Sequence, residues 1–286
     1  MRHPHLDFPV PATFVKLLDW LLEDFDPKGR RSPDEHADRK LHSILYELGG
    51  DVLSARAGKP LTDTHPHGEL GYDNWPLEII PFSANGGGGL MYAWALLAPE
   101  LELAELPCVS FAPGDDGGAV WLGDTTKQAL ETMLVGRVRG WEYWKEAPPP
   151  PQERPEWRAL CTALDLAPDL ARTDVKAGAR VSGRKIAPSA PGYRFVLTND
   201  GVGVLAPESA FDGDVDEDTL DSEEATLSRA RSYLDAGHPA SALVTLKQGC
   251  YDDTPRSLIE LMREVHGALG RPALVRRADA WLAEHA

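Results

Sequence analysis

Hydrophobic residues recur at helical spacing near the start of the chain. Over 12–25 the apolar positions are three and four residues apart, which predicts an amphipathic helix. A second helix is predicted over 33–48, because Ser32 can cap a segment that begins with Pro33 and two acidic residues. The apolar face of this second helix consists of Leu41, Ile44, Leu45 and Leu48. The residues 58–71, rich in Pro, Thr, His and Gly, predict an exposed loop.

Between 72 and 134 the pattern changes to short apolar runs separated by glycine and aspartate turns. The run that ends at Phe82 precedes four glycines, 86–89, and an aromatic and aliphatic run over 90–97 follows, so a β-hairpin is predicted. A phosphate-binding loop would need a Lys-Ser or Lys-Thr pair after the glycines, and Leu90-Met91 stands there instead. The remaining expected elements are strands over 106–112 and 119–122 and a helix over 125–134.

The order of these features resembles a known family. The segments in question are Asn74-Trp75-Pro76, Ile80-Pro81-Phe82, a glycine-rich turn, an aromatic strand, Pro107-Cys108-Val109, an aspartate turn and a closing helix. They resemble the SUKH superfamily, the Smi/Knr-type cell-wall regulators and their bacterial relatives, over about half of the chain, 12–138. The resemblance implies an α+β domain in which N-terminal helices pack on a mostly antiparallel sheet. It also implies an immunity protein that binds and neutralises a toxin.

Four consecutive prolines, 148–151, mark the domain boundary that we predict, because they force extended geometry and cannot continue a helix. A short helix over 156–166 follows, and then a hairpin over 193–205 that turns at Asn199-Asp200-Gly201. The predicted organisation is an α+β domain over 1–147, a linker over 148–155, a mixed segment over 156–220 and a helical region over 221–286.

The helical region resembles a tetratricopeptide repeat. The residues at the separations of one such unit are Ala230, Tyr233, Gly237, Ala242, Leu246 and Pro255. A second helix pair, 255–269 and 272–284, departs from the repeat at Val275 and Asp279. Because repeat units are stable only when they stack on neighbours, we expect this region to pack on the 193–205 hairpin or on the first domain.

Composition narrows the classes of function. The 29 basic and 45 acidic side chains give a net charge of -16, which argues against nucleic-acid binding and is compatible with a basic protein partner. No apolar stretch approaches the ~18–20 residues that cross a bilayer, and no signal-peptide hydrophobic region is found, so a cytoplasmic protein without membrane contact is predicted. Cys108, Cys161 and Cys250 lie far apart without a Cys-x-x-Cys pair, and they are predicted to be reduced and mostly buried.

Candidate metal and catalytic motifs are incomplete. The acidic run 212–218 alternates carboxylates as a calcium loop does, but Glu217 stands where the turn glycine belongs. Two His-Pro-His segments, 3–5 and 65–67, could surround a zinc ion, yet the alternation with proline favours exposed loops. Neither a Gly-x-Ser-x-Gly elbow nor a cysteine with a nucleophile signature occurs. We therefore predict no cofactor, no metal and no catalytic residue.

A partner-binding surface is the favoured interpretation. Acidic and aromatic residues gather near the ends and turns of the predicted sheet, where they could act as interface anchors and steering charges. These residues are Asp73, Trp75, Glu78, Asp115, Asp116 and Asp124. Trp94 and Trp121, inside strands, are predicted to be core. The first hypothesis is a non-catalytic immunity-type protein that occludes a basic toxin such as a nuclease. The alternative is a scaffold or adaptor that uses its C-terminal helices, and a hydrolase ranks third.

Overall fold

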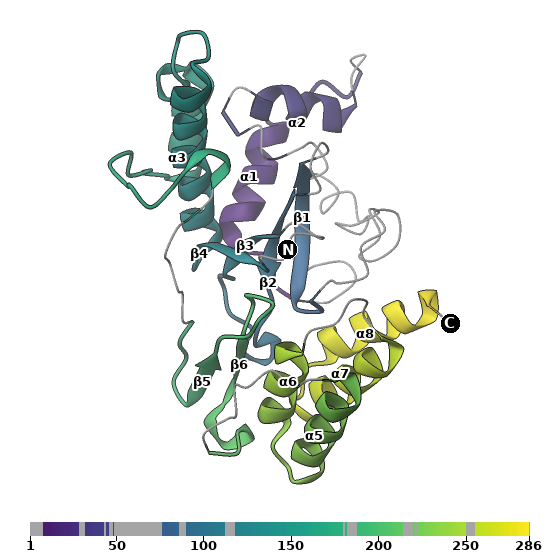
Figure 1. Ribbon diagram of the computed structural model, residues 1–286. Helices are drawn as coiled ribbons and strands as arrows, with labels where there is room; N and C mark the ends of the chain where they lie inside the picture. The colour runs from purple at the N-terminus through teal and green to yellow at the C-terminus, as the bar shows by residue number, and fades with distance from the viewer. Residues whose placement is uncertain are drawn as a thin grey trace.

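The computed structural model describes the residues 8–28, 32–42, 44–45, 48, 76–85, 90–111, 118–179, 181, 188–213, 220, 222–249 and 255–285. These residues form eight α-helices and two antiparallel sheets, which confirms the predicted α+β class and the helical C-terminal region. Figure 1 shows helices at both ends of the molecule and the strands between them. None of the helices in the described ranges is long and apolar enough to cross a membrane.

A four-stranded antiparallel sheet lies in the middle. Its strands, in order across the sheet, are β1 (Ile79–Asn85), β2 (Leu90–Ala95), β3 (Cys108–Phe111) and β4 (Val120–Gly123). The pairing of β1 with β2 confirms the predicted hairpin, while its glycines 86–89 lie outside the described residues. Since successive residues of a strand point to opposite faces, Tyr92 and Trp94 enter one core and Met91 and Ala93 another.

Helices cover one face of this sheet. They are α1 (Ala12–Leu22), α2 (Pro33–His42), α3 (Thr126–Trp144) and α4 (Pro155–Leu164). The predicted cap of α2 is confirmed, because Ser32 Oγ accepts a hydrogen bond from the Glu35 N–H at 3.2 Å and the Glu35 carboxylate accepts one from the Ser32 N–H at 3.0 Å. The helix ends at His42 and not at Leu48 as predicted, although its expected apolar residues are all buried.

The first core extends beyond the proline run. Helix α3 continues ten residues past its predicted end at Leu134, up to Trp144. After the prolines, Trp157, Leu160 and Leu164 of α4 pack in the same core as α1 and the sheet. The run 148–151 therefore does not separate two hydrophobic cores.

The second hairpin connects the sheet to the C-terminal helices. Its strands β5 (Tyr193–Val196) and β6 (Val204–Pro207) flank the predicted turn. Leu205 packs with Val109 and Trp121 on the second face of the large sheet, whereas Val204 packs against the C-terminal helices. This position of the hairpin confirms the expectation that the helical region packs on it.

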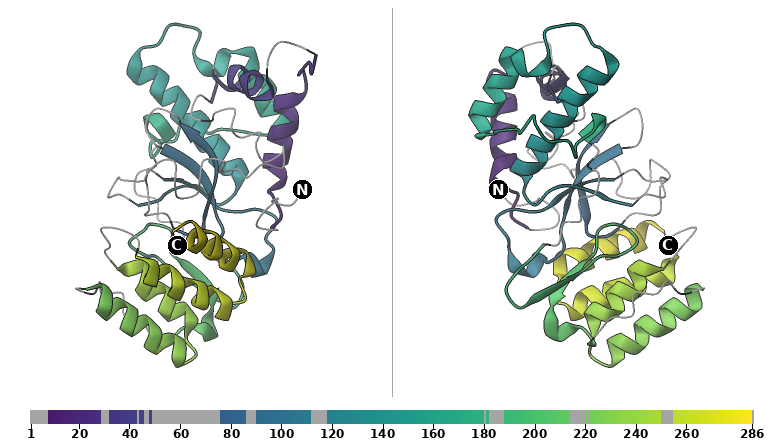
Figure 2. Two further views of the ribbon diagram at one scale, coloured as in Figure 1. Left: turned by 90° about the vertical axis from the view of Figure 1, so that its right-hand side faces the viewer. Right: turned by 60° about the vertical axis from the view of Figure 1, so that its left-hand side comes forward.

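The C-terminal helices follow one another as antiparallel neighbours in the described part of the chain. They are α5 (Glu223–Asp235), α6 (Pro239–Gln248), α7 (Arg256–Ala268) and α8 (Pro272–Glu284), and each packs on the next. Gly237, in the turn between α5 and α6, adopts a left-handed backbone conformation with φ +87°. Both views of Figure 2 show these helices at the end of the molecule opposite α2 and α3.

Candidate functional site

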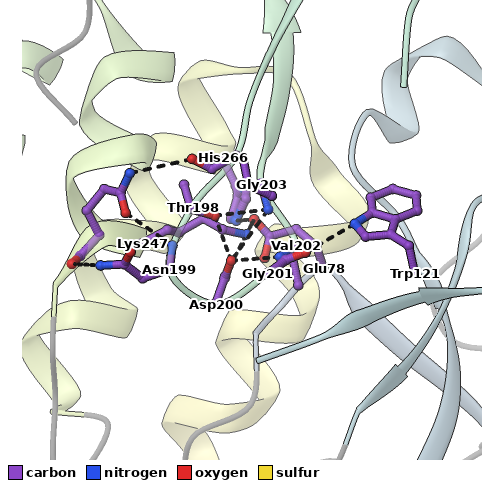
Figure 3. Close-up of polar contacts among 12 residues, drawn as sticks. Glu78, Trp121, Thr198, Asn199, Asp200, Gly201, Val202, Gly203, Lys247 and His266 are labelled. Carbon is purple, nitrogen blue, oxygen red and sulfur yellow. Dashed lines mark hydrogen bonds and ion pairs between the residues drawn. The ribbon is translucent and has the colours of Figure 1, made fainter. Parts of the chain in front are cut away.

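Charged side chains are buried where the large sheet, the second hairpin and the C-terminal helices meet (Figure 3). Lys247 of α6 places its Nζ 2.9 Å from Oε1 of Glu78, the residue before β1, and 3.1 Å from Oδ2 of Asp200 in the hairpin turn. The side chains of Lys247 and Glu78 are 1% and 3% exposed. One ammonium group thus joins three segments that are far apart in the sequence.

The turn of the second hairpin fixes the position of Asp200. The Thr198 hydroxyl and the backbone N–H of Val202 donate hydrogen bonds to Asp200 Oδ1 at 2.6 and 2.9 Å, which leaves Oδ2 directed to Lys247. Gly201 supplies the left-handed conformation at φ +73°. Its carbonyl accepts a hydrogen bond from Trp121 Nε1 at 3.2 Å, which ties the turn to β4.

Electrostatics holds these groups in fixed charge states. Burial lowers the pKa of Lys247, but the charges and hydrogen bonds of Asp200 and Glu78 outweigh it and raise the pKa above its usual value. His266 of α7, with Nε2 3.8 Å from Glu78 Oε1, is fully buried. Burial, together with the positive charges of Arg271 and Lys247, holds the pKa of His266 well below its ordinary range. At neutral pH the lysine is therefore charged and the histidine is neutral.

This arrangement suits a structural role. A nucleophile or general base must reach its substrate, and it must be free to take up a proton. Lys247 stays protonated between two carboxylates, and the His266 side chain has no exposed surface. The geometry accordingly positions the hairpin and α6 on the sheet.

The cysteines do not have the character of nucleophiles in the described part of the chain. Cys108 is free and buried, as predicted, and burial raises the pKa of its thiol to about 12, so that the reactive thiolate is not formed at neutral pH. Cys161 is free and half-buried, and burial raises its pKa as well. Cys250 lies outside the described residues.

Metal ligands do not gather within the described ranges, where no group of three His, Cys, Asp or Glu side chains could hold an ion. Most of the acidic run 212–218 and both His-Pro-His segments, 3–5 and 65–67, lie outside these ranges.

An aromatic pair is exposed at the C-terminal end of α3. Tyr143 and Trp144 are 70% and 67% exposed, and their rings meet edge to face with 4.8 Å between centroids. Beside them is an open pocket of about 560 Å³, lined by His42 of α2, Arg137 and Trp144 of α3, and Glu146. Trp, Tyr and Arg are the residues most enriched among the energetically important positions of protein interfaces. This end of the molecule is the candidate interaction site.

The six predicted surface residues are not brought together on one described surface. Asp73, Trp75, Asp115 and Asp116 lie outside the described residues. Asp124 is exposed, one residue after β4. The expectation that Glu78 is a surface charge is wrong, because its carboxylate is buried against Lys247. Glu78 and Asp124 lie at the same end of the sheet, but β1 and β4 are three strand spacings apart, about 14 Å.

Two features of the site were missed in the sequence, although each leaves a signal there. Leu243 and Val244 precede Lys247 by four and three residues, so helical periodicity places the lysine on the buried face of α6. Tyr143 and Trp144 are flanked by the charged residues Glu142 and Lys145 just before the proline run, where the apolar spacing of the helix is no longer kept. The predicted core positions of Trp94 and Trp121 are confirmed.

Comparisons with known proteins identify no relative of this chain. No protein-family model matches the chain, and no curated protein matches it.

Proposed function

We propose that the protein is a non-catalytic protein-binding module that occludes a basic partner, in the manner of the immunity proteins that its sequence resembles. The observation that carries the proposal is the exposed Tyr143–Trp144 pair beside an open pocket. Aromatic rings bury large areas with few rotatable bonds, so exposed rings on a fixed element are effective anchors for a protein partner.

The element that presents the pair is held rigidly. Helix α3 begins with a Thr125 cap that accepts a hydrogen bond from the Gln128 N–H, and its middle is crossed by the segment Ala177–Ala179. The Arg139 guanidinium donates hydrogen bonds to the carbonyls of Leu170 and Arg172 at 2.8 and 3.0 Å. A surface that is already ordered loses little conformational entropy on binding, which favours tight association.

The net charge of -16 supports a basic partner. Opposite overall charge raises the rate of association and makes that rate fall as salt screens the attraction. A nuclease toxin fits this requirement, because the surface that holds nucleic-acid phosphates is basic. The toxin itself comes from the resemblance to the SUKH superfamily and is part of the proposal.

A scaffold or adaptor function is the second candidate, because the C-terminal helices carry a surface pocket of their own. This pocket of about 370 Å³ lies at the turn between α7 and α8 and is lined by Gly267, Gly270, Arg271, Pro272, Val275 and Arg276. In this function the partner would bind α7 and α8, which lie at the end of the molecule opposite α2 and α3 (Figure 1).

The test is capture of partners from the native cell lysate by the tagged full-length chain, with identification by mass spectrometry and measurement of the association rate. We expect a basic protein whose association rate falls as salt rises. Loss of that partner in Trp144→Ala, with retention in Arg276→Glu, supports the first function, and the reverse pattern supports the adaptor. An acidic partner, or an association rate that salt leaves unchanged, contradicts the proposal.

A further inference from the structure

We propose that the pocket at the end of α3 binds an arginine side chain of the partner, between the Trp144 indole and the Glu146 carboxylate. This inference rests on the proposed function and adds the binding site and the chemistry that the site recognises. The pocket lies where the C-terminal ends of α2 and α3 come together, and it is lined by His42, Arg137, Trp144 and Glu146.

The ion pair in this pocket presents its negative member to solvent. Arg137 Nη1 and Nη2 donate two parallel hydrogen bonds to the Glu146 carboxylate, both at 2.7 Å. The Arg137 side chain is 5% exposed and the Glu146 side chain is 35% exposed, so the guanidinium is the inner partner and the carboxylate the outer one. An incoming charged group therefore meets the carboxylate first.

The carboxylate remains able to accept a second cation. The hydrogen bonds from Arg137 lower the pKa of Glu146, which keeps it ionised at neutral pH. Each carboxylate oxygen has two lone pairs, and the contact with Arg137 uses one on each oxygen. The positive charges of Arg137, Arg154 and His42 also act on Glu146, so a guanidinium is favoured here by the hydrogen bonds it can donate to the remaining lone pairs and not by the net local charge.

The indole of Trp144 forms the second side of the proposed site. Arg137 and Trp144 are seven residues apart in α3, which is about two helical turns, so they lie on the same side of the helix. A guanidinium within about 6 Å of an indole face is attracted by the ring electrons, and its flat shape stacks better than an ammonium. The chain already makes a contact of this type elsewhere, with Lys40 Nζ 4.4 Å from the centre of the Trp20 ring.

The backbone at the end of α3 fixes both groups. Lys145 ends the helix in the left-handed conformation at φ +52°, and the N–H of Glu146 donates to the carbonyl of Trp141 at 3.2 Å. The C-terminal end of a helix also carries partial negative charge, which favours a cation there. The backbone of Trp144 and Glu146 is therefore fixed before any partner arrives, and the two hydrogen bonds from Arg137 hold the Glu146 carboxylate.

The experiment measures binding of a fluorescein-labelled glycine–arginine peptide to the full-length protein by fluorescence anisotropy. Two matched peptides carry citrulline, which has the shape of arginine without its charge, or lysine. We expect the citrulline peptide to bind at least tenfold more weakly than the arginine peptide, and the lysine peptide to bind between them. Trp144→Ala and Glu146→Gln should each weaken arginine binding at least tenfold.

The control variant is Glu260→Gln, because Glu260 forms an exposed pair with Arg256 on α7, and its loss removes the same charge from a different surface. Binding that falls equally in Glu146→Gln and Glu260→Gln, or that Trp144→Ala leaves unchanged, overturns the inference. Equal binding of the lysine peptide overturns the preference for guanidinium. If Trp144→Ala loses the native basic partner but binds the arginine peptide as wild type does, the arginine site fails while the proposed function stands.

Discussion

Lys247 shows how burial changes the role of a single charged residue. An ammonium on a protein surface is solvated by water, but here it depends on the carboxylates of Glu78 and Asp200. A buried pair contributes little net stability compared with apolar residues of the same size, yet the loss of one partner is costly because it leaves the other charge buried without compensation. The three residues can therefore be tested as a unit.

We expect Lys247→Met to lower the free energy of unfolding by about 3–5 kcal/mol, because Glu78 would keep its buried charge without its lysine. The double variant Lys247→Met with Glu78→Gln should lose less than the single variant, since the carboxylate charge is then also removed. Urea unfolding followed by circular dichroism measures both. Lys127→Met, which removes an exposed lysine paired with Asp165, is the control and should change little. An equal loss in the single and double variants would argue against charge compensation.

For single residues, the sequence predicts which tryptophans are buried but not which charged side chains are buried. Trp94 and Trp121 lie within apolar strand patterns, and a local pattern is sufficient to place them in the core. The partner of Glu78 is Lys247, 169 positions further along the chain, and no local pattern relates the two. The prediction that Glu78 lies on the surface was wrong for this reason.

Among the elements, α3 is the one whose length the sequence misjudges most. The apolar pattern predicts an end at Leu134, whereas the helix runs on to Trp144 through Gly136 and Gly140. Glycine lowers helix propensity, so its presence inside a long helix calls for a tertiary reason. A Cβ added to Gly136 would lie 2.4 Å from the backbone nitrogen of Ala179, so the glycine permits Ala177–Ala179 to cross the helix. The cap of α2, by contrast, depends on neighbouring residues and was predicted correctly.

Gly136→Ala should therefore destabilise the protein by about 1–3 kcal/mol, despite the better helix propensity of alanine, because its methyl group overlaps backbone atoms that cannot move independently. Gly267→Ala in α7 is the matched control, since an added Cβ there meets nothing within 4 Å. That variant should stabilise the protein by up to about 1 kcal/mol. Thermal and urea unfolding measure both changes. A stabilising Gly136→Ala would show that the crossing segment moves away easily.

At the scale of the whole molecule, the order of segments in the sequence differs from the order of layers in space. Helix α4 follows the proline run but packs in the first core, and the second hairpin covers the remaining face of the large sheet. The predicted division at 148–155 follows composition, and composition does not report which core an amphipathic helix will join. A fragment that ends at Ala147 would lack both α4 and the hairpin, so experiments on function require the full chain.

The layered packing leads us to expect one cooperative unfolding transition. Leu205 of the hairpin packs on the sheet while Val204 packs on the C-terminal helices, and Lys247 links α6 to both. Native-state hydrogen exchange measures this coupling, because segments that open only in global unfolding share one free energy of exchange. Amides of β2 and α6 should exchange with the free energy obtained from urea unfolding. Helix α5, which packs on α6 and α7 at the edge of the helical region, should exchange earlier. If α6 instead opened well below the global free energy, the C-terminal helices would be an independent folding unit, and recognition by those helices alone would become the stronger hypothesis.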